Sequence, residues 1–73
     1  MPNPICVITL LTDFGDRDAF VASMKGVILN VNPQARVVDL SHQVRPHDVE
    51  EAAFVLQSCY HYFPDGTVHV AVV

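Results

Sequence analysis

The sequence predicts an α/β fold, a three-stranded parallel βαβαβ unit that forms the N-terminal part of a larger sheet domain. Short apolar, β-branched runs at residues 5–11, 36–40 and 67–73 alternate with two segments whose apolar residues recur at helical spacing. A right-handed crossover between successive strands makes such strands parallel and packs the helices on the sheet. An apolar content of 51% without a low-complexity tract is typical of a packed domain.

The first strand and helix are read from residues 5–33. The run ICVITLL is almost continuously apolar, as in a central strand that is covered on both faces. The turn-rich segment TDFGD follows, and Asp18 is predicted to cap the next helix. The apolar stripe of this helix consists of Phe20, Val21, Met24, Val27, Ile28 and Val31. Asn32 and Pro33 are expected to end it.

The second strand, RVVDL, leads into the loop SHQVRPH and a second helix. Asp48 or His47 opens this helix, and Glu50 and Glu51 suit the positive end of its dipole. Apolar side chains then recur at helical spacing at Val49, Ala52, Ala53, Leu56, Tyr60 and Phe63. The aromatic residues Tyr60, Tyr62 and Phe63 are expected in the core.

The third strand follows the turn Pro64-Asp65-Gly66 and runs to the last residue, Val73. An apolar last strand without a polar loop, in a parallel sheet with a bare edge, predicts that residues 1–73 are the N-terminal portion of a longer protein. The rest of this domain and a C-terminal domain are expected elsewhere. A chain of this size buries only about 60% of its unfolded surface, so its core alone would be marginal.

Charge and composition exclude several partners. The net charge is −4 and the 4 lysines and arginines are scattered, whereas nucleic-acid binding needs a basic face. The N-terminal segment has no basic region, and its apolar run is too short for a membrane span or a signal peptide. A cytoplasmic protein without a membrane partner is therefore expected. Cys6 and Cys59 share no metal-ligand spacing and are expected to be buried and reduced.

Acidic side chains gather directly after the first strand, at Asp13, Asp16 and Asp18. Ligands of parallel sheets bind outside the carboxyl ends of the strands, which makes this turn and the loop SHQVRPH the expected site. Asp13 either binds turn amides or accepts two hydrogen bonds from a vicinal diol such as that of ribose. The segment DFGDRD lacks the acid spacing of a calcium loop, and Gly15 has no second glycine nearby for a phosphate loop.

The histidines carry weaker signals. His42 and His47 lie in the second loop close to Asp39 and Asp48, so a two-histidine metal site is one alternative. Polar lining or capping is the favoured interpretation, and no metal is predicted. His61 and His69 are expected as a surface ring and a strand side chain.

The whole chain resembles one known family. The motifs TDFG, MKG, VVDLSH, DVEEAA and PDGTVHVAVV occur in the order found in the N-terminal domain of the S-adenosylmethionine (SAM) hydrolases, or SAM hydroxide adenosyltransferases. The wider family includes fluorinases and chlorinases. The resemblance implies an enzyme in which water or hydroxide attacks the 5′ carbon of the ribose, giving adenosine and L-methionine without a metal or cofactor. It also implies a homotrimer whose SAM site lies between the N-terminal domain of one subunit and the C-terminal domain of the next.

The resemblance assigns substrate-binding roles to Asp13, Asp18, Phe20 and His47. Asp13 matches an aspartate that clamps the ribose hydroxyls, and Asp18 matches an acid near the methionine amine. Phe20 replaces a Tyr, or a Ser in fluorinating members, and His47 replaces a Trp beside the ribose. The family's catalytic Asp, Arg and His are expected in and beyond the loop after the third strand. Residues 1–73 alone are therefore expected to contain no catalytic residue and to be inactive.

Two alternatives remain open beside SAM hydrolysis. The first is a non-catalytic nucleoside-binding module that keeps the fold without the machinery for the nucleophile. The second, within the enzyme class, is a SAM-dependent halogenase, which Phe20 and His47 disfavour because they differ from the Ser and Trp of fluorinating members. An Asp followed by an Arg after Val73 would favour an enzyme over a binding module.

Overall fold

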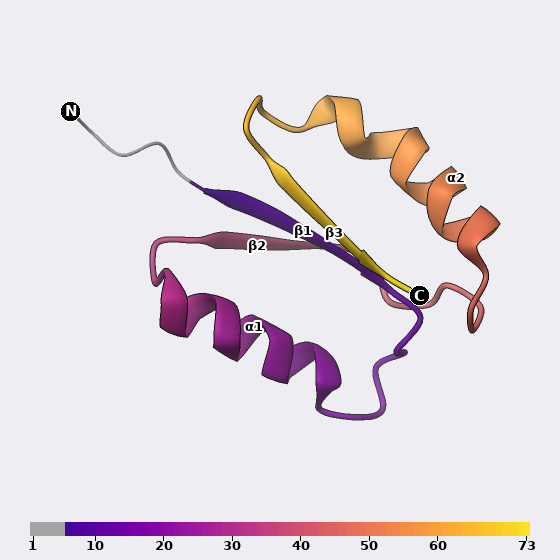
Figure 1. The fold of residues 1–73 in the computed structure, drawn as a ribbon, viewed down its shortest axis with the longest axis horizontal. Helices are drawn as coiled ribbons and strands as arrows, with labels where there is room; N and C mark the ends of the chain where they lie inside the picture. The colour runs from indigo at the N-terminus through magenta and orange to yellow at the C-terminus, as the bar shows by residue number, and fades with distance from the viewer. Residues whose placement is uncertain (1–5) are drawn as a thin grey trace.

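The computed structural model describes residues 6–73, which form one parallel sheet and two helices (Figure 1). The elements are β1 (Val7–Thr12), α1 (Phe20–Val31), β2 (Arg36–Ser41), α2 (Val49–Cys59), the short 3-10 helix η1 (Tyr60–Tyr62) and β3 (Val68–Val72). Both strand pairs are parallel and the strand order is β2-β1-β3. The predicted βαβαβ unit is confirmed. The expected start of the first strand at Ile5 lies outside the described residues.

The two helices cover opposite faces of the sheet, α1 below it and α2 above it in Figure 1. The chain crosses from β1 to β2 in one direction and from β2 over β1 to β3 in the other. Right-handed crossovers in opposite directions place their helices on opposite faces. The central strand β1 is thus covered from both sides, Leu10 by α1 and Leu11 by α2, and both side chains are buried.

The core is better closed on the α2 side than on the α1 side. Leu11, Val44 and Ala52 are buried there, and half-buried side chains pack around them: Leu40, Val55, Leu56 and Val73. Because Val44 belongs to the loop after β2, its burial anchors that loop against α2.

On the other face, the predicted apolar stripe of α1 forms but no residue of the helix is fully buried. Four residues of the stripe, together with Leu10, Val70 and Val72, line an apolar groove of about 600 Å³: Phe20, Met24, Val27 and Ile28. Val21 instead lines a polar depression, and Val31 is exposed.

The two helix starts differ from each other. Asp48 caps α2 as predicted, since its carboxylate accepts a hydrogen bond from the Glu51 amide at 2.9 Å. The prediction that Asp18 caps α1 is wrong, because Ala19 occupies the cap position and no side chain bonds the first amides. Asp18 lies one residue too early to reach those amides, and it is left exposed.

The end of the second helical segment also departs from the prediction. The α-helix ends at Cys59 and tightens into η1, which breaks the stripe because 3-10 geometry has fewer residues per turn. Tyr60 and Tyr62 were predicted in the core but are exposed by 51% and 78%. Phe63 is half-buried beside the ring of His69.

Cys6 and Cys59 are free thiols and only half-buried, so the predicted full burial is wrong. Neither helix between residues 6 and 73 has the length and apolar character needed to cross a membrane.

Candidate functional site

The candidate site lies at the carboxyl end of β1, between its two neighbours. With the order β2-β1-β3, the chain leaves β1 toward one side of the sheet and reaches β3 on the other. Such a reversal creates a crevice at the carboxyl ends of the strands, and open α/β sheets bind ligands there. Asp13 occupies this position, and its backbone N–H donates to the carbonyl of Val72 at 3.3 Å. Asp13 therefore lies where the topology favours a ligand.

The structure brings Asp13 and His47 together. The backbone N–H of His47 donates to Oδ2 of the half-buried Asp13 at 2.8 Å, joining the loops that follow β1 and β2. His47 adopts φ 60°, a left-handed conformation that is uncommon for a residue other than glycine. Backbone in this region costs about 1–3 kcal/mol and often occurs at ligand sites. Among residues 6–73, no hydrogen bond engages Oδ1 of Asp13, so this oxygen can accept from a ligand.

The turn around Asp13 is held on both sides. The Phe14 N–H donates to the Thr12 hydroxyl at 3.2 Å, and the Gly15 N–H donates to the His42 carbonyl at 2.7 Å. Gly15 has φ 71°, which suits a residue without a Cβ. These bonds fix the direction in which the Asp13 carboxylate leaves the sheet.

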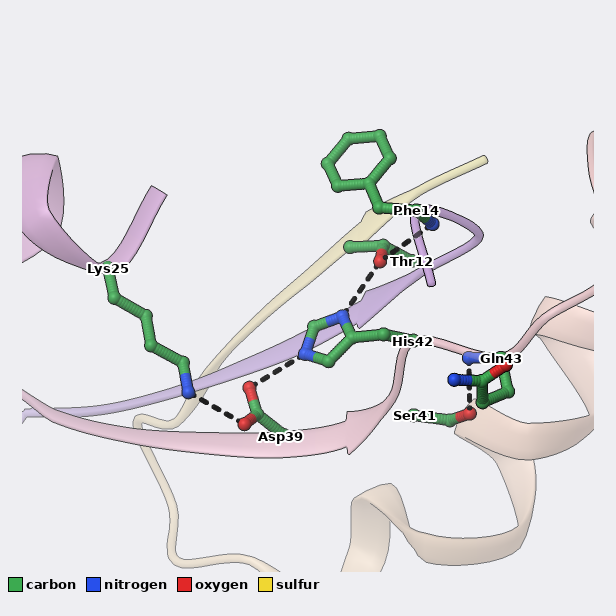
Figure 2. A network of polar contacts seen from close by, with 7 residues as sticks. All are labelled: Thr12, Phe14, Lys25, Asp39, Ser41, His42 and Gln43. Carbon is green, nitrogen blue, oxygen red and sulfur yellow. Dashed lines mark hydrogen bonds and ion pairs between the residues drawn. The ribbon is translucent and has the colours of Figure 1, made fainter. Parts of the chain in front are cut away.

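A chain of polar side chains runs under this turn (Figure 2). Lys25 Nζ donates to Asp39 Oδ2 at 2.7 Å, and Asp39 Oδ1 contacts Nε2 of His42 at 2.8 Å. Nδ1 of His42 in turn contacts the buried Thr12 hydroxyl at 2.7 Å. Residues from α1, β2, β1 and the loop after β2 are thereby connected.

A strand irregularity helps to place this chain. Asp39 and His42 are three positions apart, so a regular strand would point them to opposite faces. The register between β1 and β2 shifts after Leu10, which pairs with Asp39, since Leu11 pairs with Ser41. The extra residue, together with the strand end at Ser41, allows both side chains to meet on one side.

The charge of Asp39 is stabilised by this chain. Partial burial raises the pKa of its carboxyl, but hydrogen bonds from Lys25 and His42 and the positive charge of Lys25 hold the pKa below its ordinary value. Asp39 is therefore ionised at neutral pH, and Lys25 and His42 each contact one of its oxygens.

We expect Asp39→Asn in the full-length protein to flatten the acid limb of the stability curve. The pKa of Asp39 in the folded protein lies below its ordinary value of 3.8. The Asp39 contacts therefore stabilise the fold fully above that pH, and this stability is lost as the pH falls through the lower folded pKa. Screening at this partly exposed pair limits the loss at pH 7 to below about 1 kcal/mol. Unfolding midpoints measured between about pH 6 and pH 2 test this. Asp65→Asn, at an exposed turn, is the matched control. An equally steep acid limb in wild type and Asp39→Asn would contradict the expectation.

Two hollows flank the turn. Asp18 lines a polar depression of about 340 Å³ together with Asp16, Lys25, Asp39 and His42. Phe20 instead lines the apolar groove and packs on Phe14 with the ring centroids 5.8 Å apart. Of the predicted binding residues, Asp13 and His47 are thus in contact, while Asp18 and Phe20 lie on separate surfaces beyond the turn.

The second loop is braced by its own charges. The Arg45 N–H donates to Oε1 of Glu51 at 2.6 Å, and its guanidinium lies 3.3 Å from the Asp48 carboxylate. Between residues 6 and 73, no group of three or more His, Cys, Asp and Glu side chains is placed to hold a metal ion. His42, considered above as a metal ligand, engages both ring nitrogens with protein atoms.

Sequence reasoning missed Thr12 and Lys25. A threonine that ends an apolar strand and a lysine on the first helix carry no sequence signal of a connection, because Asp39 in β2 and His42 in the following loop link them. The motif MKG, which the family resemblance includes, was the one available hint for Lys25.

The chain is similar to several known proteins. Residues 8–73 match the family model described as the SAM hydroxide adenosyltransferase N-terminal domain. The chain is 44% identical over 71 residues to an (R)-S-adenosyl-L-methionine hydrolase of Methanocaldococcus jannaschii, covering 92% of this chain and 27% of that protein. It is 41% identical over 66 residues to a fluorinase of an Actinoplanes species, covering 90% of this chain and 22% of the relative.

A solved structure supports the same conclusion. The crystal structure of an uncharacterized conserved protein from Thermotoga maritima superposes with a TM-score of 0.87 at 39% identity, covering 90% of this chain and 25% of that one. The chain therefore spans only about a quarter of the length of its relatives. The agreement of family model, curated relatives and fold shows that this chain belongs to the SAM hydroxide adenosyltransferase family, in which it corresponds to the N-terminal domain.

Proposed function

We propose that the full-length protein cleaves SAM with water or hydroxide to adenosine and L-methionine, and that this chain supplies the ribose-binding edge. The observation that carries the proposal is the Asp13 carboxylate, which follows the carboxyl end of β1 where the strand order reverses and is held by the His47 amide at 2.8 Å. The names of curated relatives as SAM hydrolases support the reaction.

The main task of the protein in this reaction is to orient the nucleophile and the substrate. The sulfonium of SAM is already a good leaving group, so the protein must align the nucleophile with the 5′ carbon and exclude competing water. An ionised carboxylate only accepts hydrogen bonds, and its two oxygens can take both hydroxyls of a vicinal diol. Asp13 would thus fix the ribose, while the residues that activate the nucleophile belong to the rest of the protein.

The other predicted residues fit around this placement. We propose that Asp18, in the polar depression, faces the methionine amine and that Phe20 forms an apolar wall. A carboxylate suits an ammonium group electrostatically, and an aromatic wall keeps water from the reacting carbon. The contact of the His47 amide with Asp13 supports the proposal that His47 lies beside the ribose.

We further propose that the full-length protein is a homotrimer and acts in the cytoplasm. The family resemblance supports the assembly, because a site shared between subunits would complete the one that these residues begin. Sedimentation of the full-length protein tests it, with three times the monomer mass as the expected result.

Incubation of the full-length protein with SAM, with and without chloride or fluoride, is expected to yield equal amounts of adenosine and L-methionine, independent of halide. Chromatography with mass detection measures the products. A 5′-halogenated deoxyadenosine would instead establish a halogenase, which the fluorinase relatives make the specific alternative. Tight SAM binding without cleavage would establish a nucleoside-binding module.

A further inference from the structure

The hydroxyl of Thr12 is completely buried and yet has two polar partners, Nδ1 of His42 at 2.7 Å and the amide of Phe14 at 3.2 Å (Figure 2). A buried hydroxyl needs hydrogen-bond partners, because a buried polar group without one costs about 1–3 kcal/mol of stability. Thr12 lies directly before Asp13, so its bonds act on the turn that carries the carboxylate.

With a neutral His42 ring, the direction of each hydrogen bond in this series follows from the Lys25 end. The Lys25 ammonium can only donate and the Asp39 carboxylate can only accept, so Nε2 of His42 carries the proton toward Asp39. Nδ1 of His42 then accepts from the Thr12 hydroxyl, whose oxygen accepts from the Phe14 amide. A second proton, on Nδ1, would reverse the bond to Thr12 and leave the buried hydroxyl proton without this acceptor.

His42 therefore holds the turn from two sides. Through its ring it orients the Thr12 hydroxyl, which accepts from Phe14, and through its carbonyl it accepts from Gly15 at 2.7 Å. Asp13 lies between these attachments, and its side chain is held by His47.

We propose that the chain Lys25–Asp39–His42–Thr12 is a positioning device for the nucleoside-binding turn at residues 13–15. It keeps the His42 ring in one orientation and one protonation pattern, so that the Asp13 carboxylate is presented to the ribose diol in a fixed direction. The inference deepens the proposed function and rests on it. The four residues act on ribose binding through Asp13.

The same strand contains a matched control. Thr9 is also fully buried, and its hydroxyl also contacts Nδ1 of a histidine, His69, at 2.6 Å. This pair lies three residues before Thr12, away from the Asp13 turn. Thr9→Val and Thr12→Val therefore remove the same group from the same kind of bond in two places.

The test compares Thr12→Val, Thr12→Ser, Thr9→Val, His42→Ala and His42→Asn in the full-length protein. Adenosine affinity is measured by calorimetry, and hydrogen–deuterium exchange is followed at the Phe14 and Gly15 amides. Thr12→Val and His42→Ala are expected to weaken adenosine binding about tenfold or more and to accelerate that exchange. Thr12→Ser keeps the hydroxyl and is expected to stay within about threefold of wild type. His42→Asn keeps an acceptor near the Nδ1 position but loses the contact with Asp39, so its loss of affinity is expected to lie between those of wild type and His42→Ala.

Thr9→Val is expected to lower the unfolding midpoint like Thr12→Val but to leave adenosine affinity and the exchange of the turn unchanged. Equal loss of affinity in both valine variants would show a general loss of stability and overturn the proposal. Unchanged adenosine affinity in Thr12→Val would also overturn the proposal. If the wild-type protein binds neither adenosine nor SAM, the proposed function fails. The hydrogen–deuterium exchange data then decide alone whether the Lys25–Asp39–His42–Thr12 contacts hold the turn. Faster exchange in Thr12→Val, without faster exchange in Thr9→Val, is the supporting result.

Discussion

Replacement of Asp13 by alanine in the full-length protein is expected to weaken SAM binding by about 2 kcal/mol, about thirtyfold in Kd. Two losses contribute: the ribose diol loses a charged acceptor, and the His47 amide loses the oxygen that it contacts at 2.8 Å. Titration calorimetry with SAM, or with adenosine where SAM is consumed, measures the change.

Two comparisons make this prediction specific. Asp13→Asn keeps an oxygen for the His47 amide but replaces the other acceptor with a donor, so we expect an intermediate loss. Asp65→Ala removes a carboxylate from an exposed turn and should leave the affinity unchanged. Wild type should also discriminate against 2′-deoxyadenosine more strongly than Asp13→Ala does. Equal discrimination by the two proteins would show that Asp13 does not hold the diol.

The strands and helices were predictable because their signals are local. The apolar run of the first strand predicted a central strand that is covered on both faces. In the structure α1 covers Leu10 on one face and α2 covers Leu11 on the other. Helix α1 spans Phe20–Val31, the range of the predicted apolar stripe, and ends before Asn32-Pro33 as predicted, but it starts one residue later than a cap at Asp18 would place it.

The predictions that failed depended on single-residue geometry. Asp18 is a good capping residue at a position one step before the actual cap, Ala19. Tyr60 continues the helical spacing of α2, but the change to 3-10 geometry after Cys59 turns it outward. Spacing predicts that a helix exists more reliably than it predicts the last turn, where local hydrogen bonds decide.

The candidate site was predictable only in part for a related reason. The rule that ligands bind at the carboxyl ends of parallel strands was enough to select Asp13 and the loop of His47. The strand order β2-β1-β3, which makes the end of β1 the crevice, depends on long-range pairing that no local pattern contains. The contact of Thr12 with His42, 30 positions apart, likewise exists only in the folded chain.

The backbone of His47, more than its ring, explains the contact with Asp13. His47 is the one non-glycine residue between residues 6 and 73 with positive φ, and this conformation directs its amide at the Asp13 carboxylate. The neighbouring amide of Asp48 donates to the Arg45 carbonyl at 3.0 Å, which closes the turn that holds this conformation. A residue that tolerates φ 60° and keeps its N–H should therefore serve as well as histidine.

We accordingly expect His47→Gly to bind SAM within about threefold of wild type, since relief of the left-handed strain, about 1–2 kcal/mol, offsets the entropy cost of glycine. His47→Pro should lose about 3 kcal/mol or more of stability or SAM affinity, because proline lacks the N–H and fixes φ near −65°. His47→Ala keeps both the N–H and the strain of wild type, so it should also bind SAM within about threefold of wild type. Unfolding midpoints and calorimetry measure both quantities. If His47→Gly loses as much SAM affinity as Asp13→Ala, the imidazole itself must contact the substrate, and the role of residue 47 lies in its side chain.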